Sequence, residues 1–97
     1  MDEYSIWIAY VAWNDGGKLR PILIISENND FVYAFSITTK YDNKSDIIKS
    51  QYFLINDWKI SGLNEKSYID TGDILDLQKS DIKSKKPIGE LTNSDKN

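Results

Sequence analysis

The sequence predicts a mainly β domain, a small barrel or sandwich of short strands. Short segments rich in apolar, aromatic and β-branched residues recur along the chain, and clusters of Asn, Asp and Gly separate them. No segment shows the apolar period of a long amphipathic helix. With 97 residues, the chain is long enough for one domain with a single hydrophobic core.

The first two expected strands form a hairpin. Ser5–Trp13 is apolar and aromatic, as expected of a strand covered on both faces. Asn14–Gly17 follows, and its residue types tolerate the positive φ of a hairpin turn. Leu19–Ser26 is a second, nearly all-apolar strand that ends at the turn Glu27–Asp30.

The third expected strand, Phe31–Thr38, alternates in side-chain size. Its bulky face, which we expect in the core, consists of Phe31, Tyr33, Phe35 and Ile37. Its small and increasingly polar face consists of Val32, Ala34, Ser36 and Thr38. A face of this kind suits the floor of a pocket.

The remaining segments are shorter or less regular. Lys40–Ser50 is polar and predicts a loop, and Gln51–Ile55 predicts a fourth strand. Asn56–Lys66 connects it, with room for a helical turn, to a fifth strand at Ser67–Leu77. We expect this last strand to bend at Thr71–Asp73, where glycine permits a bulge. The residues expected to be largely buried are Ile8, Ile22, Ile24, Phe35 and Ile69.

The C-terminal end carries the start of a helix. Thr92 occupies the cap position, and Asp95 follows three residues later in place of the usual Glu or Gln. Only two residues follow Asp95, so the sequence predicts a truncated or absent helix. We therefore divide the chain into a barrel domain, residues 1–91, and a mobile tail, residues 92–97.

The composition limits the chemistry that the chain can perform. It contains no cysteine and no histidine, which removes disulfides, thiolate metal sites and the commonest general base. The loop carboxylates of Asp15, Asp42 and Asp46 lack the spacing of a metal loop. We expect neither a metal nor a cofactor.

The net charge of −3 and the pI near 4.8 are unusual for a nucleic-acid-binding protein. Such proteins are usually basic because neutralising phosphate supplies much of their affinity. A local basic pocket on an acidic body remains compatible with RNA binding. The N-terminus is acidic, and the apolar stretch Ile6–Trp13 is too short to span a bilayer, so we expect a cytoplasmic protein without a membrane partner.

Several motifs, in a fixed order, carry a resemblance to a known family. Arg20–Pro21 opens an apolar strand within Gly17–Ser26, and Thr38 ends the next strand within Ser36–Lys40. The later motifs are Gly62–Leu63, Ser67–Ile69 and Pro87–Thr92. In order and spacing, from Ile6 to Asp95, these motifs resemble the MazF/PemK-like toxin family.

The resemblance implies a small SH3-like β-barrel of the CcdB/PemK type that works as a metal-independent endoribonuclease. Such an mRNA interferase cleaves single-stranded RNA by attack of the 2′-hydroxyl, leaving 2′,3′-cyclic phosphate and 5′-hydroxyl ends. The implied partners are the RNA substrate, a cognate antitoxin and a second copy of the chain. A homodimer also fits strands that are apolar on both faces, since a barrel of this size can hardly cover them.

By position, the catalytic arginine of the family falls on Arg20 and its catalytic threonine on Thr38. The chain departs from the family pattern at Thr71–Asp73, where many members carry an acidic residue and Gln, and in its cut-short C-terminal helix. These departures concern the substrate contacts of the late strand and the surface that meets the dimer partner or antitoxin.

The chemistry of these residues supports the same roles. RNA carries its own nucleophile, and a guanidinium can donate two hydrogen bonds to the charged phosphorane. Its high pKa makes Arg20 a poor base, so we assign it to electrostatic stabilisation and leave the base unassigned. Thr38 can donate a hydrogen bond to the same phosphate. The residues expected to bind substrate around them are Trp13, Asn14, Lys18, Ser36, Thr39 and Lys40.

Each of these residues also has an ordinary structural interpretation. Arg20 taken alone is a surface arginine at a strand edge, and Thr38 and Thr39 are good strand residues by propensity. Two other functions therefore stay open, a non-catalytic protein-binding module that poisons a large enzyme and an inactive remnant. The nuclease hypothesis requires the side chains of Arg20 and Thr38 to face one concave, positive pocket. By strand alternation, Thr39 should point away from that pocket.

Overall fold

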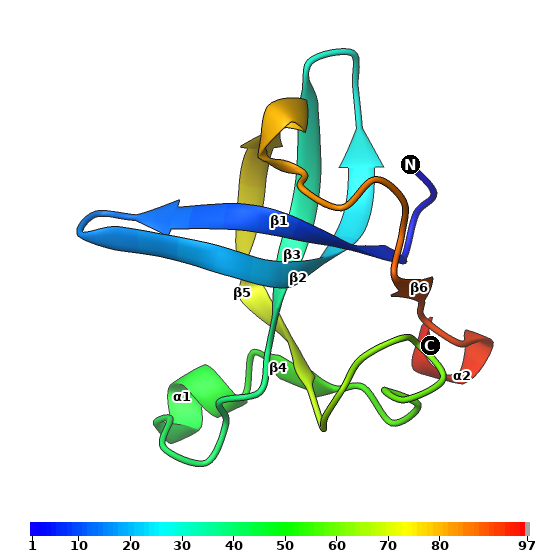
Figure 1. The fold of residues 1–97 in the computed structure, drawn as a ribbon. Coiled ribbons are helices and arrows are strands. Elements are labelled where there is room, and N and C mark those ends of the chain that lie inside the picture. The colour runs from blue at the N-terminus through cyan, green and yellow to red at the C-terminus, as the bar shows by residue number, and fades with distance from the viewer. Residues whose placement is uncertain (97) are drawn as a thin grey trace.

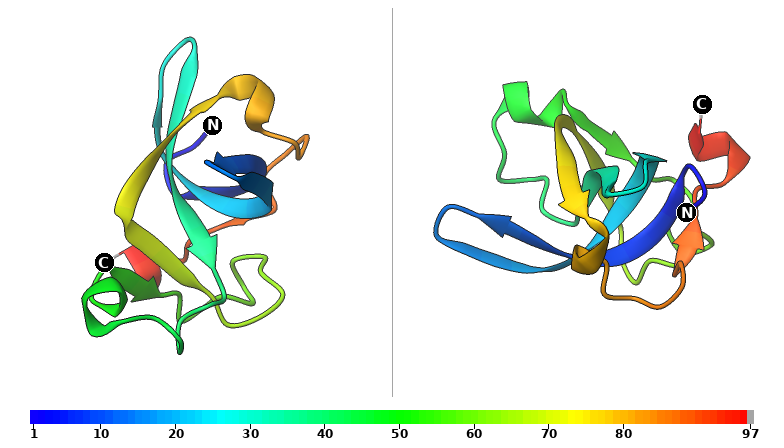
Figure 2. Two further views of the ribbon diagram at one scale, coloured as in Figure 1. Left: turned by 90° about the vertical axis from the view of Figure 1, so that its left-hand side faces the viewer. Right: turned by 90° about the horizontal axis from the view of Figure 1, so that it is seen from above.

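The strands of the chain form one six-stranded antiparallel sheet, and the sheet curls into a half-barrel (Figure 1). The computed structural model describes residues 1–96. Its strands are β1 (Ser5–Trp13), β2 (Gly16–Glu27), β3 (Phe31–Thr38), β4 (Tyr52–Leu54), β5 (Tyr68–Gln78) and β6 (Gly89–Glu90). Across the sheet they follow the order β4-β5-β3-β2-β1-β6. The predicted mainly β, small-barrel fold is confirmed, and Figure 2 shows the curl from two further directions.

Short helical segments complete the fold. They are α1 (Asp46–Lys49), the 3₁₀ turn η1 (Lys79–Asp81) and α2 (Asn93–Lys96). The helix α1 lies within the predicted loop Lys40–Ser50, where the side chain of Ser45 caps it by accepting from the backbone N–H of Ile48. Among residues 1–96, no helix is long and apolar enough to cross a membrane.

The β1–β2 hairpin projects from the body of the sheet (Figure 1, blue). Its turn consists of Asn14 and Asp15, because the ladder continues to the pair Trp13–Gly16. Strand β2 therefore begins at Gly16, earlier than the predicted start at Leu19. The predicted hairpin turn is present, and neither of its two residues has a positive φ. The aromatic rings of β1 explain the two glycines instead. A Cβ on Gly17 would lie 2.5 Å from the Tyr10 hydroxyl, and one on Gly16 would lie 3.3 Å from the Trp13 indole nitrogen.

The curled sheet buries side chains on both of its faces. One cluster of buried residues comprises Ile6, Leu23, Ile37, Ile55, Leu63, Ile69 and Leu91. The other comprises Ala9, Val11, Ile22, Ile24, Val32, Ala34 and Leu77. Ile22, Ile24 and Ile69 are buried as predicted, whereas Ile8 and Phe35 are only half-buried.

Strand β3 contributes to both clusters, which corrects the predicted division of its faces. The small residues Val32 and Ala34 are fully buried, because the large side chains of β2 cover that face. Of the bulky residues, Ile37 is buried, but Phe31 is 38% exposed and is the first residue of the strand. Strand periodicity identified the two faces correctly but did not show that both are covered.

The predicted bend in the late strand is present as a bulge in β5. Phe35 of β3 pairs with Ile74, whereas the next residue, Ser36, pairs with Asp70. The residues between, 71–73, therefore bulge out of the ladder. The carboxylate of Asp70 closes this bulge by accepting from the backbone N–H of Gly72 at 2.9 Å.

Two glycines bring the segments before β5 and around β6 into backbone contact. Gly62 has a φ of 93°, and a Cβ there would lie 2.2 Å from the Ile88 carbonyl oxygen. A Cβ on Gly89 would lie 1.9 Å from the carbonyl oxygen of Ser61. The leucines that follow these glycines in sequence, Leu63 and Leu91, belong to the same buried cluster. The Gly-Leu and Ile-Gly-x-Leu motifs therefore have a structural role.

Within the described residues, the C-terminal helix α2 is a single turn. The hydroxyl of Thr92 donates to Asp57 at 2.6 Å. The carboxylate of Asp95 accepts from the backbone N–H groups of Asn56 and Asp57 at 3.0 and 2.8 Å. These bonds hold the turn against the body. The mobility of residues 92–97 stays a prediction, and Asn97 lies outside the described residues.

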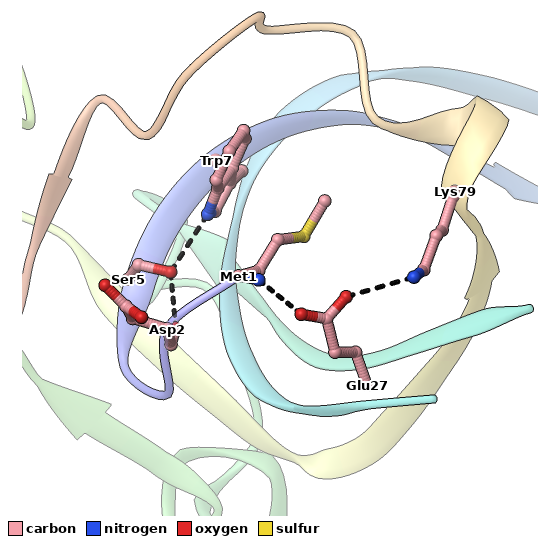
Figure 3. Close-up of polar contacts among 6 residues, drawn as sticks. All are labelled: Met1, Asp2, Ser5, Trp7, Glu27 and Lys79. Atoms are coloured by element: carbon pink, nitrogen blue, oxygen red, sulfur yellow. Dashed lines mark hydrogen bonds and ion pairs between the residues drawn. The ribbon is translucent and has the colours of Figure 1, made fainter. Parts of the chain in front are cut away.

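The N-terminal segment is tied to the sheet by polar contacts (Figure 3). The indole N–H of Trp7 donates to the Ser5 hydroxyl at 2.9 Å, and that hydroxyl donates to the carbonyl of Asp2. The Glu27 carboxylate bridges the N-terminal amine and the ammonium of Lys79. Hydrogen bonds from these two cations lower the pKa of Glu27.

Candidate active site

The candidate site begins where Pro21 ends the ladder between β2 and β3. Both backbone polar groups of Ile8, which pairs with Pro21, bond to Lys83–Ser84 on the other side of β1. Ile8 and Pro21 are thus a non-hydrogen-bonded pair, and the Pro21 nitrogen faces β3. Because proline has no N–H to donate, the β2–β3 ladder ends at the pair Ile22–Ser36.

A cleft of about 150 Å³ lies where the two strands separate. Its lining residues are Lys18, Leu19, Arg20, Pro21, Ile37, Thr38, Thr39, Lys40 and Ser67. Arg20 and Thr38 are therefore both among the residues that line one cleft. Three of the lining side chains are cationic and none is acidic, so the cleft is positive on an acidic protein.

The guanidinium of Arg20 is held in place by neighbours on the same face of the sheet. Its Nη1 donates to the hydroxyl of Ser36 at 3.0 Å, and its Cζ lies 5.8 Å from the centre of the Trp13 ring. Its Nε is buried and has no hydrogen-bond partner within residues 1–96. A buried N–H without an acceptor is costly, and more so on a charged group. An anion would supply the missing acceptor once the side chain shifts enough to expose Nε.

Thr38 and Thr39 line the cleft at the end of β3. The Thr38 Oγ1 accepts from the backbone N–H of Lys40 at 3.1 Å, which turns the chain as the strand ends. Its own O–H remains available to donate into the cleft. Thr39 is also among the residues that line the cleft. The direction of its side chain, expected to be away from the pocket, stays a prediction.

The other predicted binding residues occupy different positions. Lys18 and Lys40 are exposed and line the cleft. Ser36 is 7% exposed, and its hydroxyl accepts a hydrogen bond from Arg20, so it supports the guanidinium. Trp13 is 49% exposed and lies beside Arg20 but outside the cleft lining. Asn14 is exposed at the hairpin tip, and it is not a cleft residue.

Sequence reasoning missed a group of tyrosines beside the cleft. Tyr68 is paired with Thr38 across β3 and β5, and its ring stacks on that of Tyr41. Tyr52 lies next to them, opposite Asp70. Burial first, and the Asp70 carboxylate second, raise the pKa of Tyr52. Only the register across the β5 bulge brings these residues to the site, and no short motif encodes that register.

Within residues 1–96, no three His, Cys, Asp or Glu side chains gather in a group suited to a metal ion. Comparison of the chain with protein-family models finds no match, and comparison with curated proteins finds none. The candidate site is therefore defined by the geometry around Arg20 and Thr38.

Proposed function

We propose that the chain is an endoribonuclease toxin of the mRNA interferase kind that the motifs resemble. The observation that carries this proposal is the unpaired, buried Nε of Arg20 beside a positive cleft that Thr38 also lines. The cleft volume of about 150 Å³ is below the range of pockets for drug-sized molecules. It suits a single phosphate group of a chain whose bases lie outside.

The proposed reaction is a transesterification within RNA. The 2′-oxygen attacks the adjacent phosphorus, so that an O2′–P bond forms while the P–O5′ bond breaks. A base accepts the 2′-hydroxyl proton, the departing 5′-oxygen gains a proton, and the products are a 2′,3′-cyclic phosphate and a 5′-hydroxyl. The base stays unassigned, since a guanidinium is a poor one.

The residues of the cleft would act mainly by electrostatics. Arg20 donates to the non-bridging phosphate oxygens as their negative charge grows, and Thr38 adds a neutral donor. Ser36 and Trp13 keep the guanidinium in one orientation, which lowers the cost of positioning it. Lys18 and Lys40 attract the RNA backbone. RNA supplies the nucleophile and Arg20 the charge, so the proposed reaction is metal-independent.

The proposal extends to the setting of such a toxin, which is cytoplasmic, homodimeric and restrained by a cognate antitoxin. Phe53 and Ile74, on the face of the sheet opposite to Ser36 and Arg20, are each 60% exposed. Exposed apolar surface of this kind marks interaction sites. It supports a protein partner on the side of the sheet opposite to Arg20.

The same apolar surface favours a second candidate function, a non-catalytic protein-binding module. A groove of about 240 Å³ lies beside Phe53, and Tyr4, Phe35, Ile69 and Leu91 contribute to its lining. The acidic net charge also fits a protein partner better than RNA. In that case, Arg20 would bind no phosphate.

The experiment that separates the two functions is incubation of the purified chain with a long RNA, with and without EDTA. The nuclease proposal expects cleavage under both conditions and 5′-hydroxyl ends at the mapped sites. Cleavage that EDTA abolishes and magnesium restores would contradict the mechanism. Intact RNA under all conditions would leave the protein-binding module as the better account.

A further inference from the structure

Three tyrosines form a cluster that the proposed phosphate chemistry does not use. Tyr41 follows β3, Tyr52 belongs to β4 and Tyr68 to β5. The rings of Tyr41 and Tyr68 are stacked, with centroids 4.3 Å apart and planes 10° apart. The Tyr52 ring is tilted against both, at 6.2 and 6.5 Å. All three residues are half-buried, so each keeps part of its surface in solvent.

The cluster adjoins the cleft on the same face of the sheet. Tyr68 is directly opposite Thr38, and the side chains of paired residues lie on one face about 5 Å apart. Tyr52 lies opposite Asp70, which is itself opposite Ser36, the hydrogen-bond partner of Arg20. A base attached to a phosphate in the cleft is therefore within reach of these rings.

A lysine marks an open ring surface in the cluster. The ammonium of Lys49 lies over the Tyr41 ring, 5.0 Å from its centroid. Because Tyr68 covers one face of this ring, the ammonium lies over the other. A cation–π contact with Lys49 therefore covers that face. A nucleobase can take its place, and the displaced lysine can then pair with the RNA backbone.

We propose that Tyr41, Tyr52 and Tyr68 form a stacking subsite for a nucleobase next to the scissile phosphate of single-stranded RNA. This inference rests on the proposed nuclease function. Every base has a π-face, so the subsite strengthens binding without selecting a particular base. A purely structural cluster, which only fastens the segment 40–51 to the sheet, would be indifferent to the presence of a base.

The test is binding of a labelled RNA that carries a 2′-deoxy nucleotide at the mapped cleavage site and so cannot react. Its affinity is measured by fluorescence anisotropy for the intact strand and for strands with one abasic position, moved stepwise along the site. The parent protein should bind about tenfold more weakly to the strand whose abasic position lies next to the phosphate. Tyr41→Leu should bind the intact strand about as weakly as the parent binds that abasic strand. Its affinity should not fall further when the same base is removed.

Two variants serve as controls. Tyr41→Phe keeps the ring and should behave as the parent. Tyr33→Leu removes another half-buried tyrosine, on the opposite face of β3, and should keep the full abasic penalty. If thermal denaturation shows that Tyr41→Leu does not fold, Tyr52→Leu replaces it, since β4 is a short edge strand.

The outcomes separate the subsite from the function on which it rests. An abasic penalty that persists unchanged in Tyr41→Leu, while RNA cleavage is intact, overturns the subsite alone. A parent protein that neither binds nor cleaves RNA overturns the proposed function and the subsite together. Loss of the penalty in Tyr41→Leu, with Tyr33→Leu unaffected, supports the subsite.

Discussion

The guanidinium of Arg20 on β2 donates a hydrogen bond from Nη1 to the hydroxyl of Ser36 on β3, at 3.0 Å. The bond joins the two strands beside the point where Pro21 ends their ladder. It fixes one arm of the guanidinium, while the buried Nε has no hydrogen-bond partner among residues 1–96. A side chain held in this way is prepared to receive an anion before one arrives.

Replacement of Ser36 by alanine tests this arrangement. Ser36→Ala removes the fixed acceptor, so the rate of RNA cleavage should fall about tenfold and the free energy of unfolding by about 1 kcal/mol. Cleavage assays and thermal denaturation measure the two effects. Ser26→Ala, at an exposed position of β2, is the matched control and should change neither quantity. Parent-like cleavage by Ser36→Ala would show that the Arg20–Ser36 bond has no positioning role.

Thr38 can be tested with one variant that removes the hydroxyl and one that keeps it. Thr38→Val keeps the side-chain shape but removes the donor, so cleavage should slow about 100- to 1,000-fold. Thr38→Ser should retain most of the activity. The free energy of unfolding of both variants should lie within about 0.5 kcal/mol of the parent value. The reason is that the backbone N–H of Lys40, which donates to Thr38, is exposed and can bond water instead. Equal activity of the two variants would remove Thr38 from the mechanism.

The pH dependence of stability should report the ion pairs of Glu27 shown in Figure 3. Its pKa is lowered from the ordinary value of 4.5, so these contacts stabilise the fold above that pH. The stabilisation is lost as the pH falls through the lowered pKa of the folded state. Between pH 5 and more acidic values, the denaturation midpoint of Glu27→Gln should therefore fall less than that of the parent.

The control for this pH series is Glu3→Gln, which neutralises an exposed carboxylate that has no ion pair within residues 1–96. It should keep the parental acid sensitivity. High salt should weaken the Glu27 effect, because the pairs are near the surface. Acid curves of identical shape for Glu27→Gln and the parent would contradict the role of these ion pairs.

The contact between the segments around Gly62 and Gly89 predicts a severe loss of stability on substitution. Gly89→Ala places a Cβ 1.9 Å from the Ser61 carbonyl oxygen, and backbone must move to relieve it. The free energy of unfolding should fall by about 2 kcal/mol or more, measured by denaturant titration. Gly16→Ala is the comparison, since its Cβ meets a Trp13 side chain that can shift, and it should cost about 1 kcal/mol. A Gly89→Ala protein as stable as the parent would mean that this contact is looser than described.

Sequence patterns predicted the strands well and their packing less well. The bounds of β1 and β3 follow from composition and from the turns that flank them, and both agree with the structure. The curl of the sheet could not be predicted from alternation, because it covers both faces and buries Ala34 more deeply than Phe35. Whether a strand face is covered depends on how the whole sheet closes.

The residues of the candidate site also differ in how far the sequence alone could predict them. The expectation that Arg20 and Thr38 share a site came from the resemblance of the motifs, since either residue taken alone has an ordinary structural interpretation. The tyrosines 41, 52 and 68 could not be predicted, because their meeting depends on the bulge that sets the register of β5 against β3.

The most direct test of the account is RNA cleavage by the parent, Arg20→Ala and Arg20→Lys, with the product ends mapped. The parent should leave 5′-hydroxyl ends, and Arg20→Ala should lose about 100-fold or more in rate. Arg20→Lys should also cleave poorly, since lysine keeps the charge but not the two-pronged donor. Lys59→Ala, which removes an exposed cation outside the cleft, should cleave as the parent does. Parent-like cleavage by Arg20→Ala would contradict the assignment of this cleft as the active site.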